Sequence, residues 1–142
     1  MEHNTFQKVK KIKKRMYGPE KLLVCGYSAA EHENLLAFLE QCGLKKIPVV
    51  FVADEDSNVS LMELLGREDR SGKGHDSGLK RAIIVSGFTQ DNLHLLISAY
   101  RSANFPPQLW ATLTAISEGW SIGFLLQELE KEAEAMRKIR KK

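Results

Sequence analysis

Two segments of the chain place a hydroxyl residue two positions after a glycine, at the end of an apolar run. They are Cys25-Gly26-Tyr27-Ser28 and Ser86-Gly87-Phe88-Thr89. A helical pattern follows each, and the free N–H groups of a helix N-terminus can hold an anion or phosphate. The ordinary interpretation is that Ser28 and Thr89 cap their own helices. We favour capping, because a phosphate loop needs more than one glycine and a suitably placed lysine.

A second candidate for chemistry is the thiol of Cys25, which precedes a predicted helix. Cys25 would be an activated nucleophile if His32 folded back toward it. Against this, a buried and inert cysteine is common. We therefore predict no catalytic residue, although a thiol or hydrolytic enzyme stays an alternative.

The acidic run Asp54-Glu55-Asp56 also ends an apolar segment, where carboxylates could bind Mg²⁺. Asp56 is equally well explained as a helix cap, and a solvated loop is the favoured interpretation. The four histidines share no spacing that zinc would need. We expect neither a metal site nor a cofactor.

Basic residues gather at both ends of the chain. Residues 1–21 carry a charge of +5 and residues 131–142 carry +4, so the body between them is acidic. Residues 1–18 show an apolar stripe at helical spacing, which predicts a basic amphipathic helix. Such a helix can contact nucleic acid or pack on the domain. The residues that would contact nucleic acid are Lys10, Lys11, Lys13, Lys14 and Arg15.

Four apolar runs predict buried strands, at 22–27, 49–53, 82–88 and 109–115. Helical patterns separate them, with Ser28, Asp56, Thr89 and Ser117 as expected caps. Strands that alternate with helices predict an α/β fold with a mostly parallel four-stranded sheet flanked by helices. The run at 109–115 contains two threonines, and we expect it at the edge. Trp110 and Trp120 are interpreted as packing residues.

Residues 22–65 of the first β-α-β-α unit (21–66) align without a gap with residues 83–126 of the second unit (81–142), at an offset of 61 residues. Six of the 44 aligned pairs are identical, and the strand-end glycines and the hydroxyl caps coincide. We expect a duplication, although any two β-α-β-α units have a similar spacing of apolar residues. Residues 67–80 are polar and glycine-rich, which predicts a flexible connector inside one overall domain. Because two copies would satisfy each other, a monomer is expected.

The second unit resembles a family known as domain of unknown function 3783. The similarity consists of a strand ending in Gly87-Phe88-Thr89, the strand Leu109-Trp110-Ala111-x-Leu113-Thr114, and Trp120-Ser121-Ile122 followed by Leu125-Leu126-x-Glu128-Leu129. Residues 21–66 would be a degenerate copy of the same unit. The resemblance implies a fold and no activity.

These observations predict a cytoplasmic, non-enzymatic binding or regulatory module for a small anionic ligand or a protein partner. The chain has no apolar run of the length that spans a membrane and no secretory signal. In open α/β sheets, ligands bind outside the carboxyl ends of the strands. The residues expected there are Gly26, Ser28, Asp54, Asp56, Gly87 and Thr89. The alternative class is a nucleic-acid- or ribosome-associated protein acting through its basic ends.

Overall fold

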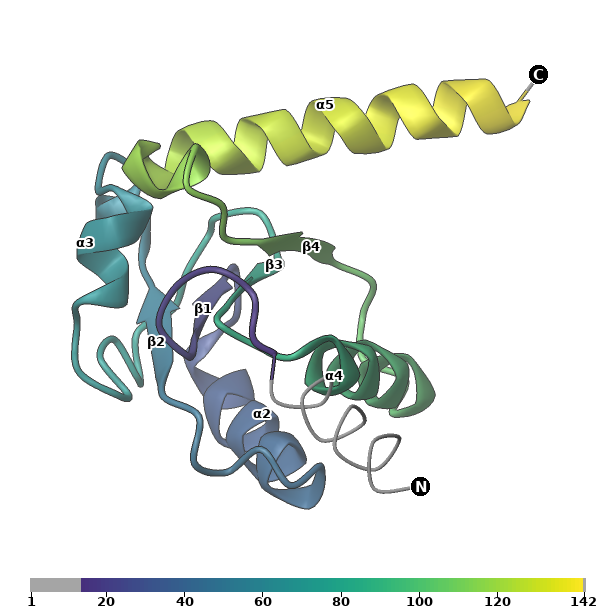
Figure 1. Cartoon of the computed structure of the whole chain (residues 1–142). Coiled ribbons are helices and arrows are strands. Elements are labelled where there is room, and N and C mark those ends of the chain that lie inside the picture. Colours follow the sequence, from purple (N-terminus) through teal and green to yellow (C-terminus); the bar gives the residue numbers. More distant parts are fainter. Residues whose placement is uncertain (1–13, 142) are drawn as a thin grey trace.

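A computed structural model of the chain describes residues 14–141. Its sheet has four strands: β1 (Lys21–Cys25), β2 (Val49–Val52), β3 (Ala82–Ser86) and β4 (Leu109–Thr112). They lie in the order β2-β1-β3-β4 (Figure 1). The predicted α/β fold and the edge position of β4 are therefore confirmed.

The sheet is mostly parallel, with one antiparallel pair at its centre. β1 is parallel to β2 and β3 is parallel to β4, whereas β1 and β3 run antiparallel. The carboxyl ends of β1 and β2 consequently lie at one end of the sheet, and those of β3 and β4 lie at the other. This arrangement corrects our expectation that all four strand ends gather at one site.

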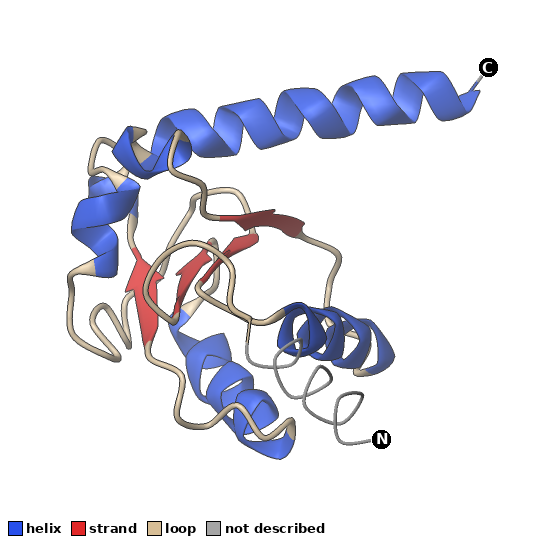
Figure 2. Cartoon of the chain, viewed as in Figure 1, coloured by secondary structure: helices blue, strands red, loops and turns tan. Residues whose placement is uncertain are grey.

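Helices cover both faces of the sheet (Figure 2). One face carries α2 (Ala29–Gln41) and α4 (Gln90–Ser102), and the other carries α3 (Leu61–Leu65) and α5 (Ile122–Lys141). Side chains alternate along a strand, so Leu22 and Val24 of β1 face α2, while Leu23 and Cys25 face α3. Burial on both faces is the reason that the strands read as continuous apolar runs.

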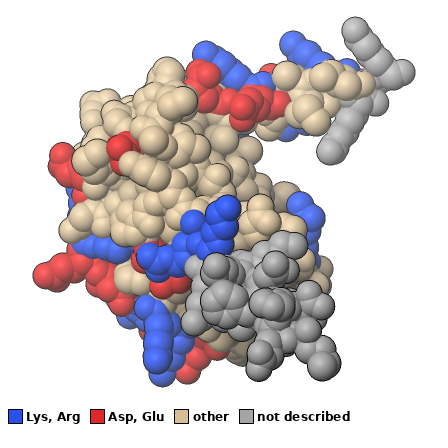
Figure 3. Space-filling model, viewed as in Figure 1, with Lys and Arg blue, Asp and Glu red and all other residues tan. Residues whose placement is uncertain are grey.

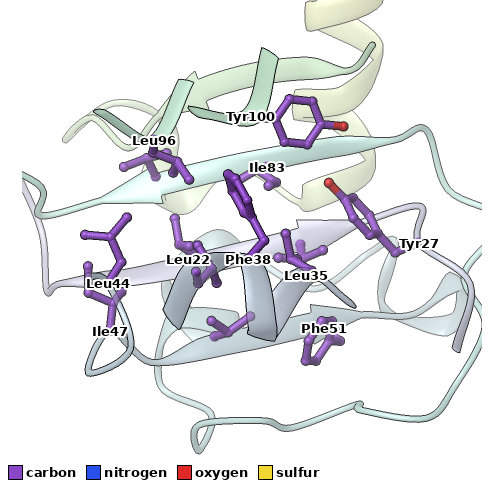
Figure 4. Close-up of a cluster of buried hydrophobic side chains, with 14 of the residues drawn as sticks. Leu22, Tyr27, Leu35, Phe38, Leu44, Ile47, Phe51, Ile83, Leu96 and Tyr100 are labelled. Atoms are coloured by element: carbon purple, nitrogen blue, oxygen red, sulfur yellow. The ribbon is translucent and has the colours of Figure 1, made fainter. Parts of the chain in front are cut away.

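The core under α2 and α4 is rich in aromatic side chains. Phe38 lies edge-on to Tyr100, with ring centroids 6.3 Å apart, and Tyr27 reaches the same layer from the end of β1 (Figure 4). Leu22, Leu35 and Leu96 fill the layer with no exposed surface. Burying a leucine of this kind contributes about 2 kcal/mol to folding.

The backbone of the second half follows that of the first at the predicted offset of 61. Leu22 pairs with Val49 and Ile83 pairs with Trp110, and the later pairs follow in step. Helices α2 and α4 begin and end at aligned residues. Gly43 and Asn104, which follow these helices, both have a positive φ, at 80° and 62°.

The two halves also meet on a local twofold axis. Ser60 and Ser121, which are aligned, form an antiparallel bridge with each other. The Leu61 N–H donates to the Trp120 carbonyl and the Ile122 N–H donates to the Val59 carbonyl, each at 2.9 Å. Ser60 and Ser121 also cap α3 and α5, since each hydroxyl accepts an N–H from the first turn. The expected caps Asp56 and Ser117 are wrong, because each closes a short turn before the helix.

Each half is closed by the segment that precedes the other half's first strand. Residues 14–20 lie against the carboxyl end of β3, and the Met16 N–H donates to the Phe88 carbonyl at 2.8 Å. These residues are not helical, so the basic helix predicted for 1–18 does not include 14–18. Residues 1–13 of that prediction lie outside the described residues.

The strand-end glycines are explained by these closing segments. Gly26 and Gly87 have φ values of 78° and 70°. A Cβ on Gly26 would lie 2.5 Å from the Leu79 carbonyl oxygen, and one on Gly87 would lie 2.5 Å from that of Gly18. Both positions therefore require glycine for backbone packing.

The connector 67–80 makes specific contacts with the first half. The Arg70 N–H donates to the Val49 carbonyl, and the Phe51 N–H donates to the Ser71 carbonyl at 2.8 Å. The connector therefore lies along the outer edge of β2. Across residues 14–141, no helix is long and apolar enough to cross a membrane.

Candidate functional site

The strand-end residues expected to bind a ligand fall into two groups at opposite ends of the sheet. Gly26, Ser28, Asp54 and Asp56 follow β1 and β2, whereas Gly87 and Thr89 follow β3. Each group is close to a segment of the chain itself. The hydrogen-bonding groups that would face a ligand are largely engaged by that segment.

At the first end, the connector takes the place predicted for an anion. The carboxylate of Asp76 accepts the Ala29 N–H of α2 at 2.7 Å, and the Ser77 hydroxyl accepts the Gly26 N–H at 3.2 Å. The Gly78 N–H donates to Asp54 at 2.7 Å. Ser28 is the residue before α2, and its N–H donates to Glu31 at 3.0 Å.

At the second end, main-chain groups of residues 15–18 perform the same role. The Gly87 N–H donates to the Tyr17 carbonyl at 3.1 Å, and Arg15 forms an antiparallel bridge with Thr89. The Thr89 hydroxyl accepts the Asn92 N–H at 3.1 Å, as an N-cap does. Gly87 and Thr89 therefore have structural roles of their own.

Asp56 is part of a partly buried ion pair. Both of its carboxylate oxygens accept from the Arg67 guanidinium at 3.0 Å, and one also accepts the Ala53 N–H. Burial of the carboxyl opposes ionisation, but these hydrogen bonds outweigh it and lower the Asp56 pKa. This carboxylate is held for structure. No group of three or more metal-binding side chains occurs between residues 14 and 141.

Cys25 and His32 lie on opposite faces of the sheet. The Cys25 side chain packs with Leu23 and Val52 under α3, and burial raises the pKa of its thiol. The His32 ring stacks on Phe51 at 4.0 Å, and its Nδ1 accepts the Gly74 N–H. Burial lowers the His32 pKa, so the imidazole is neutral. The structure therefore does not bring together the thiol and base considered from the sequence.

Of the residues considered for nucleic-acid contact, Lys14 is exposed, and Arg15 pairs with Glu20 at 3.7 Å. Lys10, Lys11 and Lys13 lie outside the described residues. Basic side chains lie along α5 (Figure 3), and Arg137 and Lys138 of this helix are exposed. The described part of the chain leaves nucleic-acid binding as a prediction.

A polar cluster that the sequence did not reveal lies where β3 and β4 begin. Arg81 lies 3.8 Å above the Tyr27 ring and pairs with Glu31 at 2.7 Å. The Tyr27 hydroxyl donates to the Gln108 side-chain carbonyl at 2.7 Å. Burial raises the Tyr27 pKa, so the phenol stays protonated. Cation and ring attract each other strongly here, because both are shielded from water.

The start of the β3–β4 ladder positions this cluster. The Leu109 N–H donates to the Arg81 carbonyl at 3.1 Å, which sets Gln108 beside Arg81. Pro106 and Pro107 keep α4 from continuing toward β4, and the Tyr100 hydroxyl donates to the Pro106 carbonyl. The two strand beginnings and the end of α4 thus meet at one place.

Two donors in the cluster have no partner among residues 14–141. They are Nη2 of Arg81 and Nε2 of Gln108, and both atoms are buried. A buried donor without an acceptor costs about 1–3 kcal/mol, so binding of an oxygen acceptor to such a group is favoured. A carbonyl or carboxylate oxygen is the natural acceptor for a guanidinium and an amide.

A hollow of about 390 Å³ adjoins this cluster at Gln108 and Tyr100. Three of its seven lining residues are aromatic: Tyr100 stacks on Phe105 at 5.0 Å and lies edge-on to Trp110 at 5.3 Å. Arg101 and Asn104 supply polar groups at its lining. Apolar walls with a few polar groups are typical of small-molecule sites.

The sequence contained one signal for this cluster that we did not use. Arg81 aligns with Glu20 at the offset of 61, so the charge is reversed at equivalent places before β3 and β1. Gln108 aligns with Ile47, which is buried in the core. At these two aligned positions the second half has an opposite charge and a polar side chain in place of an apolar one. Such differences indicate a feature that only one half possesses.

The fold and the cluster together define an α/β protein with two β-α-β-α halves and one polar cluster. Comparison with known families gives one match, which covers residues 81–136 and is described as Domain of unknown function (DUF3783). The second unit of the chain therefore matches the model of that family, as the resemblance predicted. No curated protein and no solved structure matches the chain.

Proposed function

We propose that this protein is a non-enzymatic binding module that holds a small anionic ligand in the hollow beside Gln108. The supporting observation is the buried amide donor of Gln108, which lines this hollow, together with the buried guanidinium donor of Arg81 in the adjoining cluster. The ligand that fits has a carboxylate for these donors and a flat apolar body for Trp110 and Phe105.

The side chains at this place favour binding over reaction. The polar groups that line the hollow are the amides of Asn104 and Gln108, the guanidinium of Arg101 and the phenol of Tyr100, and no carboxylate or imidazole of residues 14–141 lines it. Such groups hold a ligand at neutral pH and transfer no proton from it. The Cys25 thiol, which would be the nucleophile of an enzyme, is buried on the far face.

The proposal can be tested through the fluorescence of Trp110. In a Trp120→Phe variant, Trp110 is the single tryptophan, and it lines the hollow. Titration with benzoate, as the simplest aromatic carboxylate, should change its emission saturably. Benzyl alcohol, which lacks the charge, should bind at least about tenfold more weakly, a difference of about 1.4 kcal/mol.

Gln108→Leu should weaken benzoate binding by a similar factor, because one donor to the carboxylate is lost. The matched control is Gln127→Leu, an exposed position on α5 outside this hollow. Benzoate binding that is absent, or that Gln108→Leu leaves unchanged, would show the proposal to be wrong. The chain could then still be a binding module, but for a protein partner instead of a small ligand.

Binding of nucleic acid through the basic ends is the second candidate, supported by the exposed side chains of Lys14, Arg137 and Lys138. Retention on heparin should fall with salt, and it should weaken when Lys10, Lys11 and Lys13 are replaced by Gln. Replacement is the better test, because deleting residues 14–17 would also uncover Gly87. Unchanged retention would rule out a role for the basic N-terminus.

We also infer that the two halves arose by duplication of one β-α-β-α unit. The common offset of the strand registers, helix bounds and caps supports this origin. Family members with a single unit should then form homodimers through an antiparallel pair of their first strands. A single-unit member that sediments as a monomer would contradict the inference.

A further inference from the structure

The two outer strands of the sheet turn the same main-chain groups toward the outside. In the β3–β4 ladder, Leu109 and Leu113 donate their N–H groups to β3, so Trp110 and Thr112 direct theirs away from the sheet. The aligned residues in β2 are Val49 and Phe51. Both edges therefore turn an N–H and a carbonyl outward at each of these two residues.

At β2, the chain itself satisfies most of these groups. Val49 donates its N–H to the Asp69 carboxylate at 2.8 Å and accepts the Arg70 N–H at 2.6 Å. Phe51 donates to the Ser71 carbonyl at 2.8 Å. At β4, no hydrogen bond within residues 14–141 reaches the outward groups of Trp110 and Thr112.

The free edge of β4 also lacks the usual protection of an edge strand. Its sequence is Leu-Trp-Ala-Thr, without charge or proline, and such an edge readily pairs with another strand. A hollow of about 360 Å³ lies beside it, with apolar walls from α4 and α5. The wall residues from the helices are Leu93, Ile97 and Leu129, and Glu132 of α5 adds one carboxylate.

Helix α5 runs past this edge and beyond the body of the molecule (Figures 1 and 3). Its 20 residues span about 30 Å, whereas four strands span only about 15 Å. Its apolar stripe is buried at Leu126, which is 4% exposed, but Met136 is 54% exposed. The same stripe that packs on the sheet thus continues with nothing beneath it among residues 14–141.

The charges of α5 are arranged in two blocks. Residues 128–134 contain four Glu and one Lys, whereas residues 137–141 contain four basic residues and no acidic one. Two α5 helices that lie antiparallel would set the acidic block of one against the basic block of the other. Such complementarity favours a second copy of this chain as the partner.

We propose that two copies of this chain form a homodimer by pairing their β4 strands antiparallel about Ala111. Trp110 of each copy then exchanges hydrogen bonds with Thr112 of the second copy, and every outward group of both residues is satisfied. The α5 helix of each copy covers the hollow at the other's edge. The monomer was expected because the two halves would satisfy each other, but the observed strand order leaves the outer edge of β4 outside that pairing.

Sedimentation of the full chain across a dilution series should show reversible association to twice the subunit mass of 16.0 kDa. Thr112→Pro should raise the dimer dissociation constant at least about tenfold, because it removes one outward N–H from each copy. Thr112→Val is the matched control, since it keeps the N–H and the strand preference. This control should associate as the natural chain does.

Met136→Lys tests the helix independently, because its side chain is exposed and its replacement leaves the core unchanged. It should weaken association about tenfold or more, whereas Gln127→Lys, on the opposite side of α5, should not. A chain that stays monomeric at every concentration would overturn the proposal. So would a dimer that neither Thr112→Pro nor Met136→Lys weakens, because its interface would lie elsewhere.

Discussion

The two halves of this protein share a backbone and differ in what surrounds it. β2 and β4 have the same register with their inner neighbours, yet the connector covers β2 and leaves β4 free. Arg81 anchors a buried cluster, while the aligned Glu20 makes an ion pair with Arg15 at 3.7 Å. The shared features are those that build a scaffold, so the features of one half alone are the best guide to function.

The strongest test of the shared scaffold is replacement of its two strand-end glycines. Gly26→Ala and Gly87→Ala should each destabilise the fold by about 3–5 kcal/mol, from positive φ and a clash with backbone. Urea unfolding measures the loss. Gly43→Ala is the control, because its φ is also positive but no atom lies within 4 Å of the new Cβ, and it should cost only about 1–2 kcal/mol. Unequal losses of unfolding free energy at Gly26 and Gly87 would show that the two glycines do not have equivalent roles in the two halves.

The second test concerns the polar group that closes the turn after each outer strand. Asp56 accepts the Ala53 N–H, and the aligned Ser117 accepts the Thr114 N–H. Arg67→Met leaves the Asp56 carboxylate without its partner and should cost about 2–3 kcal/mol in the free energy of unfolding. Arg70→Met, which breaks a more exposed pair with Asp69, should cost less than about 1 kcal/mol.

The same ion pair makes the first half sensitive to acid. The folded Asp56 pKa lies below its unfolded value, so the stabilisation is present above about pH 3.9 and is lost as the pH falls further. Asp56→Ser, which copies the second half, should flatten the acid side of the stability curve measured by urea unfolding. An unchanged slope would show that other carboxyls dominate.

The third test is a substitution that should raise the free energy of unfolding instead of lowering it. Ser86 aligns with Cys25, and its buried hydroxyl has no hydrogen-bond partner within residues 14–141. Ser86→Ala should stabilise the protein by about 1 kcal/mol, because an unsatisfied polar group is removed. Cys25→Ser should destabilise it by burying a hydroxyl in the other half. Destabilisation by Ser86→Ala would indicate that the hydroxyl has an acceptor.

The smallest expected effects are at the helix caps. Thr89 accepts an N–H of α4, whereas the first N–H of α2 is satisfied by Asp76. Thr89→Ala should therefore cost about 1 kcal/mol, and Ser28→Ala only a few tenths. Asp76→Ala should cost about as much as Thr89→Ala. Equal costs at Ser28 and Thr89 in urea unfolding would mean that Asp76 does not replace the cap.

The strands and helices, and which of their residues are buried, could be predicted from the sequence. Apolar spacing and the glycines after β1 and β3 determine these features through neighbouring residues alone. Strand direction could not be predicted, since a connector of the length of 67–80 permits either pairing of β3. The candidate cluster was hidden for a related reason. Arg81 and Gln108 are ordinary residues at the start of two strands, and only the ladder between those strands joins them.

The closing segments have a consequence for how the chain acquires its structure. The end of β1 is covered by residues made after the first half, and the end of β3 is covered by residues made before it. Because β1 and β3 also pair with each other, neither half makes all of its final contacts until the other has been synthesised. We expect a single cooperative unfolding transition, in which calorimetric and van't Hoff enthalpies agree, despite the repeated architecture.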